Sequence, residues 1–290
     1  MGFLNLEKNI MRLTYFLLFN FLVVSAYAQV TTPQPSPRSS ITQQVGLTQI
    51  EIDYSRPSAR GRKIMDGLVR YGDIWRTGAN KNTTISFSDP VIIEGQTLAA
   101  GKYALYTRPS ANQWQVYFYK KNDLGDASSN WEEDQVALTA SASSVYFDPM
   151  IETFTILLTN LQSNSAALVL IWEHTLVPIS IVVPTESKAQ ESIDKTLSGE
   201  PKAGDYYQAA VYYLQENKDL KKAQSWMETA LEMREKPAYW MYRQYALILA
   251  ERNDKDAALK AVKKSLALAE KAGNKDYVIM NKASIAEWSN

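Results

Sequence analysis

The sequence predicts a two-module α+β protein: an antiparallel β-sandwich, jelly-roll-like in type, followed by a small all-α module of helical repeats. Three observations predict this fold class. Residues 42–184 alternate apolar and polar side chains in short runs between turn residues, the pattern of half-buried strands. Residues 203–290 are rich in Ala, Lys, Leu and Glu at helical spacing. This second region also resembles itself at an offset of 35 residues, which indicates a repeat.

The composition excludes several kinds of chemistry. The chain has 290 residues, with 31 Lys+Arg against 31 Asp+Glu, one His and no Cys. Without Cys there is no disulfide framework and no thiol nucleophile, and a single His argues against a multi-histidine metal site or a Ser-His-Asp triad. Zero net charge argues against a nucleic-acid partner. We therefore expect no metal, no cofactor and no nucleic-acid binding.

The first 28 residues predict export. Lys8 and Arg12 precede an apolar run of about 12 residues, which ends in Ala26-Tyr27-Ala28. A basic start, a short apolar centre and an Ala-x-Ala end form a secretory signal peptide, here cleaved before Gln29. The alternative is a membrane anchor, but the run is shorter than the ~20 residues that span a bilayer. We expect a periplasmic or extracellular protein with no stable membrane insertion after cleavage.

Residues 29–41 are Pro-rich and predict an extended linker before the β-sandwich domain, 42–184. Ile50 to Tyr54 alternates cleanly, whereas Val45 and Leu47 alternate in the opposite phase, which predicts a β-bulge or a twist near Thr48-Gln49. About nine short strands fit a sandwich. They are expected at 50–54, 84–88, 91–93, 102–107, 114–119, 135–140, 152–159, 166–172 and 179–183.

After a second linker, 185–202, the helical module occupies 203–290. The 35-residue offset places Tyr207 over Tyr242 and predicts pairs of helices joined by short polar turns. This region resembles two tetratricopeptide repeats, although that family's Gly is replaced by Val211 and Ala246. An unrelated helical bundle is the alternative, since two repeats are fewer than the usual three. Helices are expected at 205–216, 220–234, 238–251, 255–271 and 276–288, the last as a cap.

The repeat region is crowded with aromatic side chains, which have two interpretations. Tyr207, Trp240 and Tyr242 lie on the expected first helices of the repeats. An aromatic inner face can dock a peptide segment of a protein partner, so these three are the candidate partner-binding residues. The alternative is that they pack inside the repeats.

The neutral chain contains two opposed charged segments. Residues 54–81 carry seven basic and two acidic side chains, and residues 122–152 carry seven acids and no base. Arginine forks suit carboxylates and phosphates, so the basic segment is a candidate anion site. The alternative, which the sequence leaves open, is that the two segments pair with each other inside the domain.

A loop within the basic segment carries the candidate ligand-binding residues. In Trp75-Arg76-Thr77-Gly78-Ala79-Asn80, Gly78 permits a sharp turn and an indole stands beside a guanidinium and an amide. Such a set binds sugars or carboxylates by stacking and hydrogen bonding. It also fits a Trp that plugs the end of a sandwich, with Arg76 bonded to backbone carbonyls. The candidates are Arg56, Arg62, Trp75, Arg76 and Asn80.

These residues carry a family resemblance. Tyr54-Ser-Arg-Pro-Ser, the Trp75–Asn80 run, Gly101-Lys-Tyr-Ala-Leu-Tyr106 and Trp172-Glu173 resemble a secreted bacterial family, found mainly in Bacteroidetes and catalogued as domain of unknown function 2911. The resemblance covers about residues 30–184. It implies export and a domain boundary, and it brings no reaction and no catalytic residues.

An acidic run and the single histidine are the remaining candidates for catalytic groups. Glu132-Glu133-Asp134 beside Trp131 could supply the paired carboxylates of a glycosidase, but adjacent acids on a loop are usually solvated. His174 is expected to be a hydrogen-bonder at a strand end. We therefore expect an exported, non-catalytic binding protein of the cell envelope that takes an anionic or sugar ligand and a protein partner. The alternatives are a metal-independent glycan hydrolase and a purely structural component.

Overall fold

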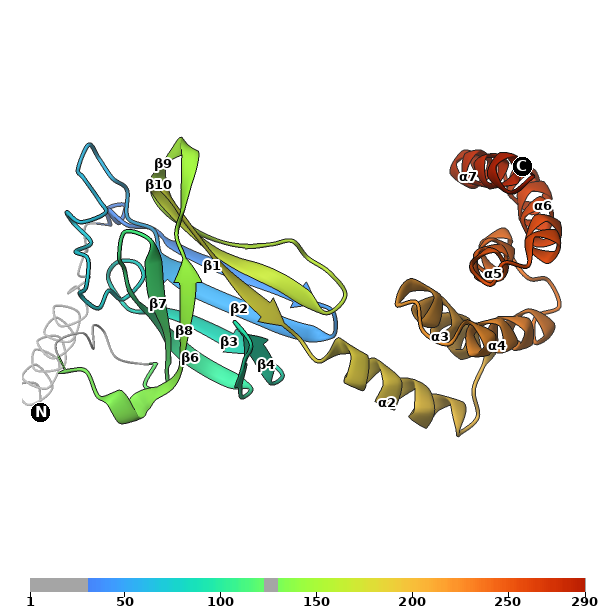
Figure 1. The fold of residues 1–290 in the computed structure, drawn as a ribbon, viewed down its shortest axis with the longest axis horizontal. Coiled ribbons are helices and arrows are strands. Elements are labelled where there is room, and N and C mark those ends of the chain that lie inside the picture. Colours follow the sequence, from blue (N-terminus) through green and yellow to red (C-terminus); the bar gives the residue numbers. More distant parts are fainter. Residues whose placement is uncertain (1–30, 123–129, 290) are drawn as a thin grey trace, which may run out of the picture.

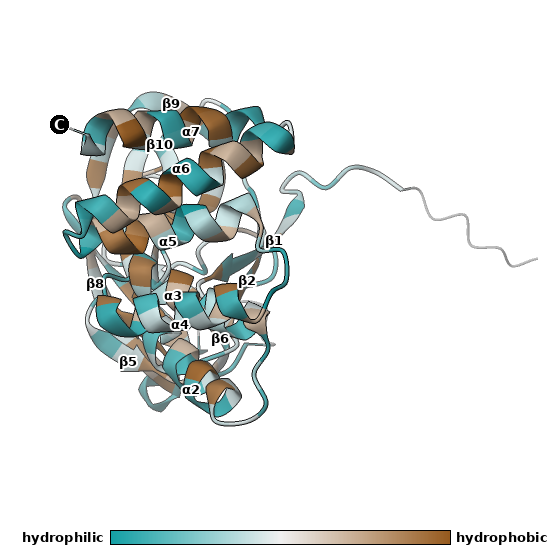
Figure 2. Cartoon of the chain, turned by 90° about the vertical axis from the view of Figure 1, so that its right-hand side faces the viewer, coloured by the Kyte–Doolittle hydropathy of each residue, from teal (hydrophilic) through white to brown (hydrophobic). Residues whose placement is uncertain are grey.

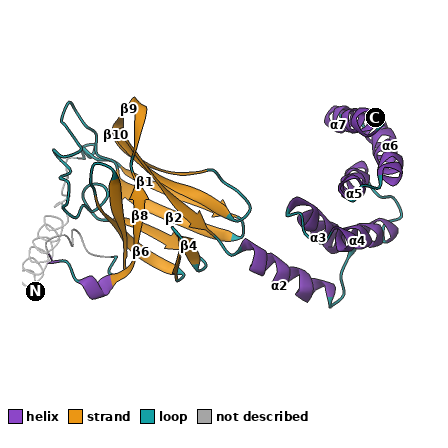
Figure 3. Ribbon diagram, in the orientation of Figure 1, coloured by secondary structure: helices purple, strands orange, loops and turns teal. Residues whose placement is uncertain are grey.

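A computed structural model describes residues 31–122 and 130–289 (Figure 1). Within these ranges, ten β-strands form two antiparallel sheets, and six α-helices follow them toward the C-terminus (Figure 3). The predicted fold class, an antiparallel β domain followed by an all-helical region, is therefore confirmed. The predicted signal peptide lies outside the described residues.

The larger sheet has six strands in the order β1-β2-β3-β6-β7-β8. β2 alternates buried and exposed side chains because the second sheet covers one of its faces, whereas β6 and β7 are buried on both faces because Ile74 and Trp131 cover the outer one. The strands are β1 (Arg38–Val45), β2 (Thr48–Ser55), β3 (Thr83–Phe87), β6 (Gly101–Arg108), β7 (Gln113–Tyr119) and β8 (Val136–Ser143).

The smaller sheet has four strands in the order β5-β4-β10-β9. The strands are β4 (Val91–Ile93), β5 (Gln96–Leu98), β9 (Val145–Thr159) and β10 (Ser165–Val182). One apolar core lies between the two sheets. Its largest fully buried side chains include Trp114, Trp172, Tyr54, Phe118 and Phe154. These aromatic rings bury the most area per residue and therefore dominate the packing of the domain.

The bulge predicted near Thr48 is wrong, because a hairpin turn lies there. Val45 pairs directly with Thr48, which leaves Gly46 and Leu47 as a two-residue loop. Gly46 has φ +53°, and a glycine with positive φ at the first loop position is what such a tight hairpin requires. The turn reverses the chain, which explains why the alternation changes phase. β1 also begins at Arg38, inside the segment predicted as the Pro-rich linker.

β10 was expected as two strands and is one strand that folds back on itself. The amide of Val183, just after β10, donates to the carbonyl oxygen of Asn164, just before it, at 2.8 Å. A straight strand of 18 residues would instead separate its ends by about 60 Å. The bend coincides with shifts of register against β9 around Glu173, which has φ +49°.

The helical region contains α2 (Thr185–Leu197), α3 (Ala203–Gln215), α4 (Leu220–Glu232), α5 (Tyr239–Glu251), α6 (Lys255–Lys271) and α7 (Lys275–Trp288). In Figure 2, α3 to α7 are stacked one beside another, each with both polar and apolar residues. The last five helices match the predicted ranges to within two residues at each end. α2, α4 and α6 begin 35 residues apart, and α3, α5 and α7 begin 36 apart.

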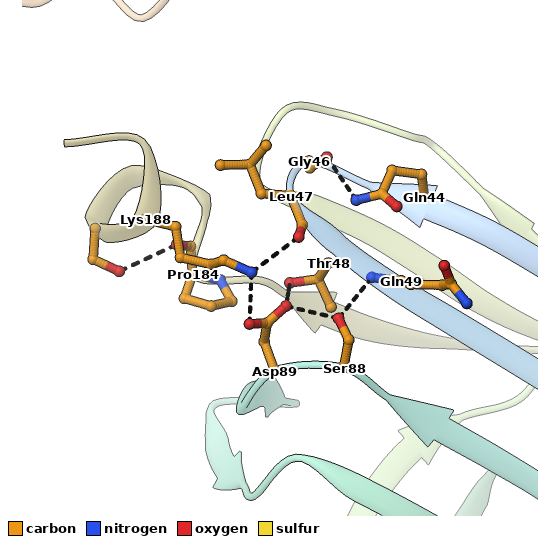
Figure 4. A network of polar contacts seen from close by, with 10 residues as sticks. Gln44, Gly46, Leu47, Thr48, Gln49, Ser88, Asp89, Pro184 and Lys188 are labelled. Carbon is orange, nitrogen blue, oxygen red and sulfur yellow. Dashed lines mark hydrogen bonds and ion pairs between the residues drawn. The ribbon is translucent and has the colours of Figure 1, made fainter. Parts of the chain in front are cut away.

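α2 occupies most of the segment predicted as a linker, 185–202. It forms because Pro184 precedes its first turn and because two partners hold it. Ile193 packs against the core of α3 and α4, and Gln190 accepts a hydrogen bond from Tyr213 at 2.8 Å. At its other end, Lys188 reaches the β domain (Figure 4). The helix therefore connects the two regions rather than separating them flexibly.

Candidate functional site

The family-like motif residues meet at one end of the sandwich, around Trp75. Its ring stacks on Trp172, with centroids 5.9 Å apart, and lies edge-on to Phe154 at 5.0 Å and to Trp114 at 6.2 Å. Tyr54 extends the cluster through Phe154 at 5.9 Å. Such edge-on and offset contacts are the favoured aromatic geometries. The sequence alternative of a Trp that plugs the end of the sandwich describes this arrangement.

The Trp75 loop is held by its backbone. Trp75 and Thr107 exchange both backbone hydrogen bonds, at 2.7 and 2.9 Å, and the indole Nε1 donates to the carbonyl of Gly78 at 3.1 Å. Gly78 has φ +153°, and a Cβ there would lie 3.0 Å from Ser55 O and from Thr83 Oγ1. Glycine is therefore required for this close approach, and the indole nitrogen is already used inside the loop.

Arg56 joins the two sheets. It follows β2, and its guanidinium donates to the carbonyl oxygen of Phe154 at 3.2 Å and to Thr155 Oγ1 at 2.7 Å, both on β9. Its own amide donates to Pro37 O. The half-buried side chain thus spans from the six-stranded to the four-stranded sheet. Its donors bind protein acceptors, which describes a structural cross-link.

The other polar candidates bind backbone as well. Arg62 is exposed and donates to two carbonyls of its own loop, at 58–59. Asn80 is exposed, with φ +58°, and donates to Ser36 O at 3.2 Å. Arg76 is half-buried next to Trp75. The structure therefore places the five candidates around one end of the domain. It brings Trp75 into the core and leaves Arg62 and Asn80 on the surface.

The basic and acidic segments touch through their backbones. Ala59 N donates to Glu152 O at 2.8 Å, and Arg60 N donates to the Glu152 carboxylate at 2.7 Å. Among the described residues, no ion pair joins side chains of 54–81 to side chains of 130–152. The loop after β2 therefore covers the free edge of β9 by hydrogen bonding rather than by ion pairing, which also protects that edge.

Glu173 is a motif residue whose role the sequence did not indicate. Its carboxylate accepts hydrogen bonds from the amides of Ile64, at 3.2 Å, and Met65, at 3.4 Å. It lies at the bend of β10, with φ +49°, so the carboxylate binds the loop before β3 to the strand that folds back. The sequence signal was its place in the Trp172-Glu173 motif alone.

His174 lies within β10 rather than at a strand end, and it is a hydrogen-bonder as expected. Nδ1 is 3.1 Å from the carbonyl oxygens of Phe147 and Asp148, and the ring stacks on Tyr146 at 5.3 Å. Carbonyl oxygens only accept, so Nδ1 carries the proton. The imidazole therefore holds the segment of β9 that bulges out opposite the bend.

The acidic run 132–134 is engaged on the surface. Glu132 pairs with Lys121 at 2.6 Å, and Glu133 accepts from Trp131 Nε1 at 2.8 Å. The indole of Trp131 in turn covers the ring of Tyr119, with centroids 4.7 Å apart. The Glu133 carboxylate thereby helps to hold Trp131 over the outer face of the larger sheet.

The structure separates the three aromatic candidates of the helical region. Trp240 is 39% exposed. Tyr207 packs in the core shared by α3 and α4, and Tyr242 lies under Lys264, whose Nζ is 4.2 Å from the ring centroid. Only Trp240 is therefore on an open face of α5. Leu247, which the sequence analysis did not single out, lies seven residues further along the same face.

That face of α5 leads to a cavity. Trp240, Arg243, Leu247 and Glu251 recur at helical spacing and share one side of the helix. Leu247 and Glu251, with Leu214 of α3 and Asn217 of the turn after it, line a cavity of about 310 Å³.

α7 borders the other end of this face. Arg243 donates to Ser284 Oγ at 2.8 Å and lies 3.4 Å from the carbonyl of Met280. Met280 and its neighbour Ile279 are 40% and 67% exposed. The helical region thus presents an apolar surface beside a cavity.

These features define a β-sandwich protein with a helical extension, in which the polar side chains of the motifs form hydrogen bonds within the fold. The chain belongs to the family described as protein of unknown function (DUF2911), whose model matches residues 36–181. No curated protein and no solved structure matches the chain. In residues 31–122 and 130–289, no helix has the length and apolarity to cross a bilayer. The same residues bring together no metal-binding group of three or more His, Asp or Glu side chains.

Proposed function

We propose that the protein is an exported, non-catalytic binding protein, in which the helical region binds a protein partner and the β domain supports it. One observation carries this proposal: the face of α5 that runs from exposed Trp240 to the Leu214–Leu247 cavity. Tryptophan and aliphatic side chains beside a cavity are the residues that contribute most to protein binding. Exposed apolar surface of this kind marks an interaction site rather than a solvated face.

The β domain supports a non-catalytic role. Its motif residues Arg56, Arg62, Asn80, Glu173 and His174 are bonded to backbone or to neighbouring side chains. A catalytic group must reach the substrate with a proton or lone pair that it can exchange, whereas the hydrogen bonds to the fold hold Arg56, Arg62, Asn80 and Glu173 in place, and His174 is held through Nδ1. Export is supported by the basic, apolar and Ala-x-Ala pattern of residues 1–28.

The partner is expected to offer an aliphatic side chain to the cavity and an apolar or aromatic neighbour to Trp240. Leu214 and Leu247 supply apolar walls, while Asn217 and Glu251 supply polar groups at the rim. This combination of an apolar centre and polar edge is the usual anatomy of a protein interface. The peptide would lie along α5 toward α7.

The test is site-specific photo-crosslinking of the full chain, expressed in its own host. A photoreactive phenylalanine analogue replaces Trp240 or Leu247, and the matched control carries it at Ser225, which is exposed on α4. We expect one discrete adduct from both test positions and none from Ser225. The crosslinked peptide, identified by mass spectrometry, should carry an aliphatic residue at the attachment point.

A second variant decides whether the cavity matters. Leu247→Asp should abolish the Trp240 adduct while the far-ultraviolet circular dichroism and the melting temperature of the chain stay unchanged within error. An adduct with the mass of two copies of this chain would show self-association and contradict a separate partner. An adduct that survives Leu247→Asp would show that the α5 face is not the binding surface.

A further inference from the structure

The bend of β10 creates a second cavity, remote from the helical face. Ala166 and Ala167 come from the first half of β10, and Ile179 and Ser180 from the half that returns. Together with the 141–145 segment they line a cavity of about 510 Å³, within the usual range for small-ligand sites. It lies where β8 of one sheet faces β10 of the other. Gln96 Nε2 bridges the two sheets nearby, at 2.9 Å from Thr139 O.

Polar side chains that make no hydrogen bond to the described part of the protein surround this cavity. The serine hydroxyls belong to β8 and to the two halves of β10. The two amide groups belong to the turn between β9 and β10. Within residues 31–122 and 130–289 none of them bonds to another group. They are Ser141, Ser143, Asn160, Gln162, Ser165 and Ser180. At the other end of the domain, the polar motif residues are hydrogen-bonded within the fold, whereas the polar side chains around this cavity are not.

The accessible floor of the cavity is apolar and small. Ala142, Ala166 and Ile179 are buried in the core behind it, whereas Val145, 51% exposed, Ala167 and Pro178 offer apolar surface that a ligand can contact. A cavity with an apolar floor and a rim of hydroxyl and amide groups offers two kinds of contact. The floor takes C–H groups, and the rim donates to and accepts from hydroxyls.

The charge of the lining selects against anions. Its one ionisable side chain is Glu94, and no Lys or Arg lines the cavity. The Glu94 carboxylate accepts the amide hydrogen of Ser180, and Glu94 N donates to Ser180 O at 3.2 Å. The carboxylate is thereby fixed at the edge of the cavity. A negatively charged ligand would meet this carboxylate without a compensating cation.

We propose that the cavity in the fold of β10 binds a neutral carbohydrate, with its ring against Val145, Ala167 and Pro178 and its hydroxyls on the serine and amide groups of the rim. This site is independent of the helical face and goes beyond the function proposed above. It also places ligand binding away from the Arg56–Asn80 candidates of the sequence.

The test is a titration of the full mature chain, labelled with ¹⁵N, with cellobiose and with di-N-acetylchitobiose at millimolar concentration. We expect saturable shifts of the backbone amides of Ser141, Ser165 and Ser180 with at least one of the two sugars. The double variant Gln162→Ala/Ser165→Ala should weaken that binding about threefold to tenfold or more, since each lost hydrogen bond to a ligand costs about that factor. Ser225→Ala on α4 is the matched control and should bind as the parent does.

Two outcomes would overturn the proposal. The first is that neither sugar produces saturable shifts at these amides. The second is that the double variant, with an unchanged melting temperature, binds as tightly as the Ser225→Ala control. A comparison of glucuronic acid with glucose tests whether the ligand is neutral. Glucuronic acid should bind more weakly, because its carboxylate would meet that of Glu94. Equal or tighter binding of the acid would contradict the role given to Glu94.

Discussion

Lys188 Nζ lies 2.6 Å from Asp89 Oδ1 and thereby joins α2 to the turn between β3 and β4 (Figure 4). The same ammonium donates to Leu47 O at 3.1 Å. The other carboxylate oxygen of Asp89 accepts from Thr48 Oγ1 at 2.9 Å and from Ser88 Oγ at 2.7 Å. The Asp89 carboxylate therefore links α2 to the β1–β2 turn and to the β3–β4 turn.

This joint should contribute measurably to stability. The two side chains are 36% and 17% exposed, so the pair is partly shielded from water. Lys188→Met should lower the free energy of unfolding by about 1 kcal/mol, and a double-mutant cycle with Asp89→Asn should give a coupling of about 0.5–1 kcal/mol. Urea unfolding of the four proteins measures both values. Strictly additive effects would show that the contact contributes nothing.

The joint should also depend on pH. The hydrogen bond from Lys188, followed by those from Ser88 and Thr48, holds the pKa of Asp89 below its ordinary value, although burial opposes this. The unfolded chain then binds the proton first, so the contribution is complete above the unfolded pKa of about 3.9 and is lost as the pH falls through the folded value. The stability difference between the parent and Asp89→Asn should therefore shrink between pH 6 and pH 3. A constant difference would contradict this.

Gly46 should tolerate no side chain. It has φ +53°, and a Cβ would collide with Thr185 Oγ1 and Ser163 O. Gly46→Ala should destabilise by about 2–4 kcal/mol, from overpacking together with left-handed strain. Gly72→Ala is the matched control, because Gly72 also has positive φ, +83°, but open space at its Cβ; it should lose only about 1 kcal/mol. Thermal melts compare the two, and equal losses would show that backbone strain alone matters.

Arg56 should stabilise the sandwich. Arg56→Met removes the donors to Phe154 O and Thr155 Oγ1 and should cost about 1–3 kcal/mol, because the acceptors on β9 lose their partner. Arg70→Met is the control; Arg70 is exposed and makes no hydrogen bond within the described residues, so its loss should stay within about 0.5 kcal/mol. Chemical denaturation measures the loss of stability in both variants. Equal losses would show that Arg56 does not act as a cross-link between the sheets.

Trp75, on the loop before β3, and Trp240, at the start of α5, should respond differently to replacement by alanine. Trp75→Ala empties the centre of the aromatic cluster formed with Trp114, Phe154 and Trp172 and should cost about 3–5 kcal/mol. Trp240→Ala removes a surface side chain and should change stability by less than about 0.5 kcal/mol while weakening partner capture. A large loss of stability in Trp240→Ala would place that side chain in the core.

The elements with strong local periodicity could be predicted from the sequence. The ranges 102–107 and 114–119 lie inside β6 and β7, and the helices after α2 match closely. Two features were missed for different reasons. The two-residue hairpin at Gly46 changes the phase of the alternation as a bulge would. The bend at Glu173 could not be predicted, because its carboxylate accepts hydrogen bonds from amides more than 100 residues earlier in the chain.

The candidate site shows the same limit. Trp75, Arg56 and Asn80, which residue type singled out as candidates, lie at one end of the domain. Composition could not say whether their polar groups were free, because that depends on which carbonyls the fold brings near. The serines around the bend of β10 could not be recognised from the sequence, because nothing distinguishes them from other strand and turn residues. They line a cavity only because β10 folds back and brings Val183 next to Asn164.

That return has a consequence for the order of folding. The closing contacts of the β domain join residues far apart in the chain, such as Tyr54 with Ile156, whereas each helix pair contacts its immediate neighbour in sequence. High contact order slows folding. The β domain is therefore complete only when β10 has joined it, and α2, which follows β10, reaches Asp89 only then. The helices should reach their native structure first, and the assembly of the β domain should set the time in which the chain is open to proteolysis.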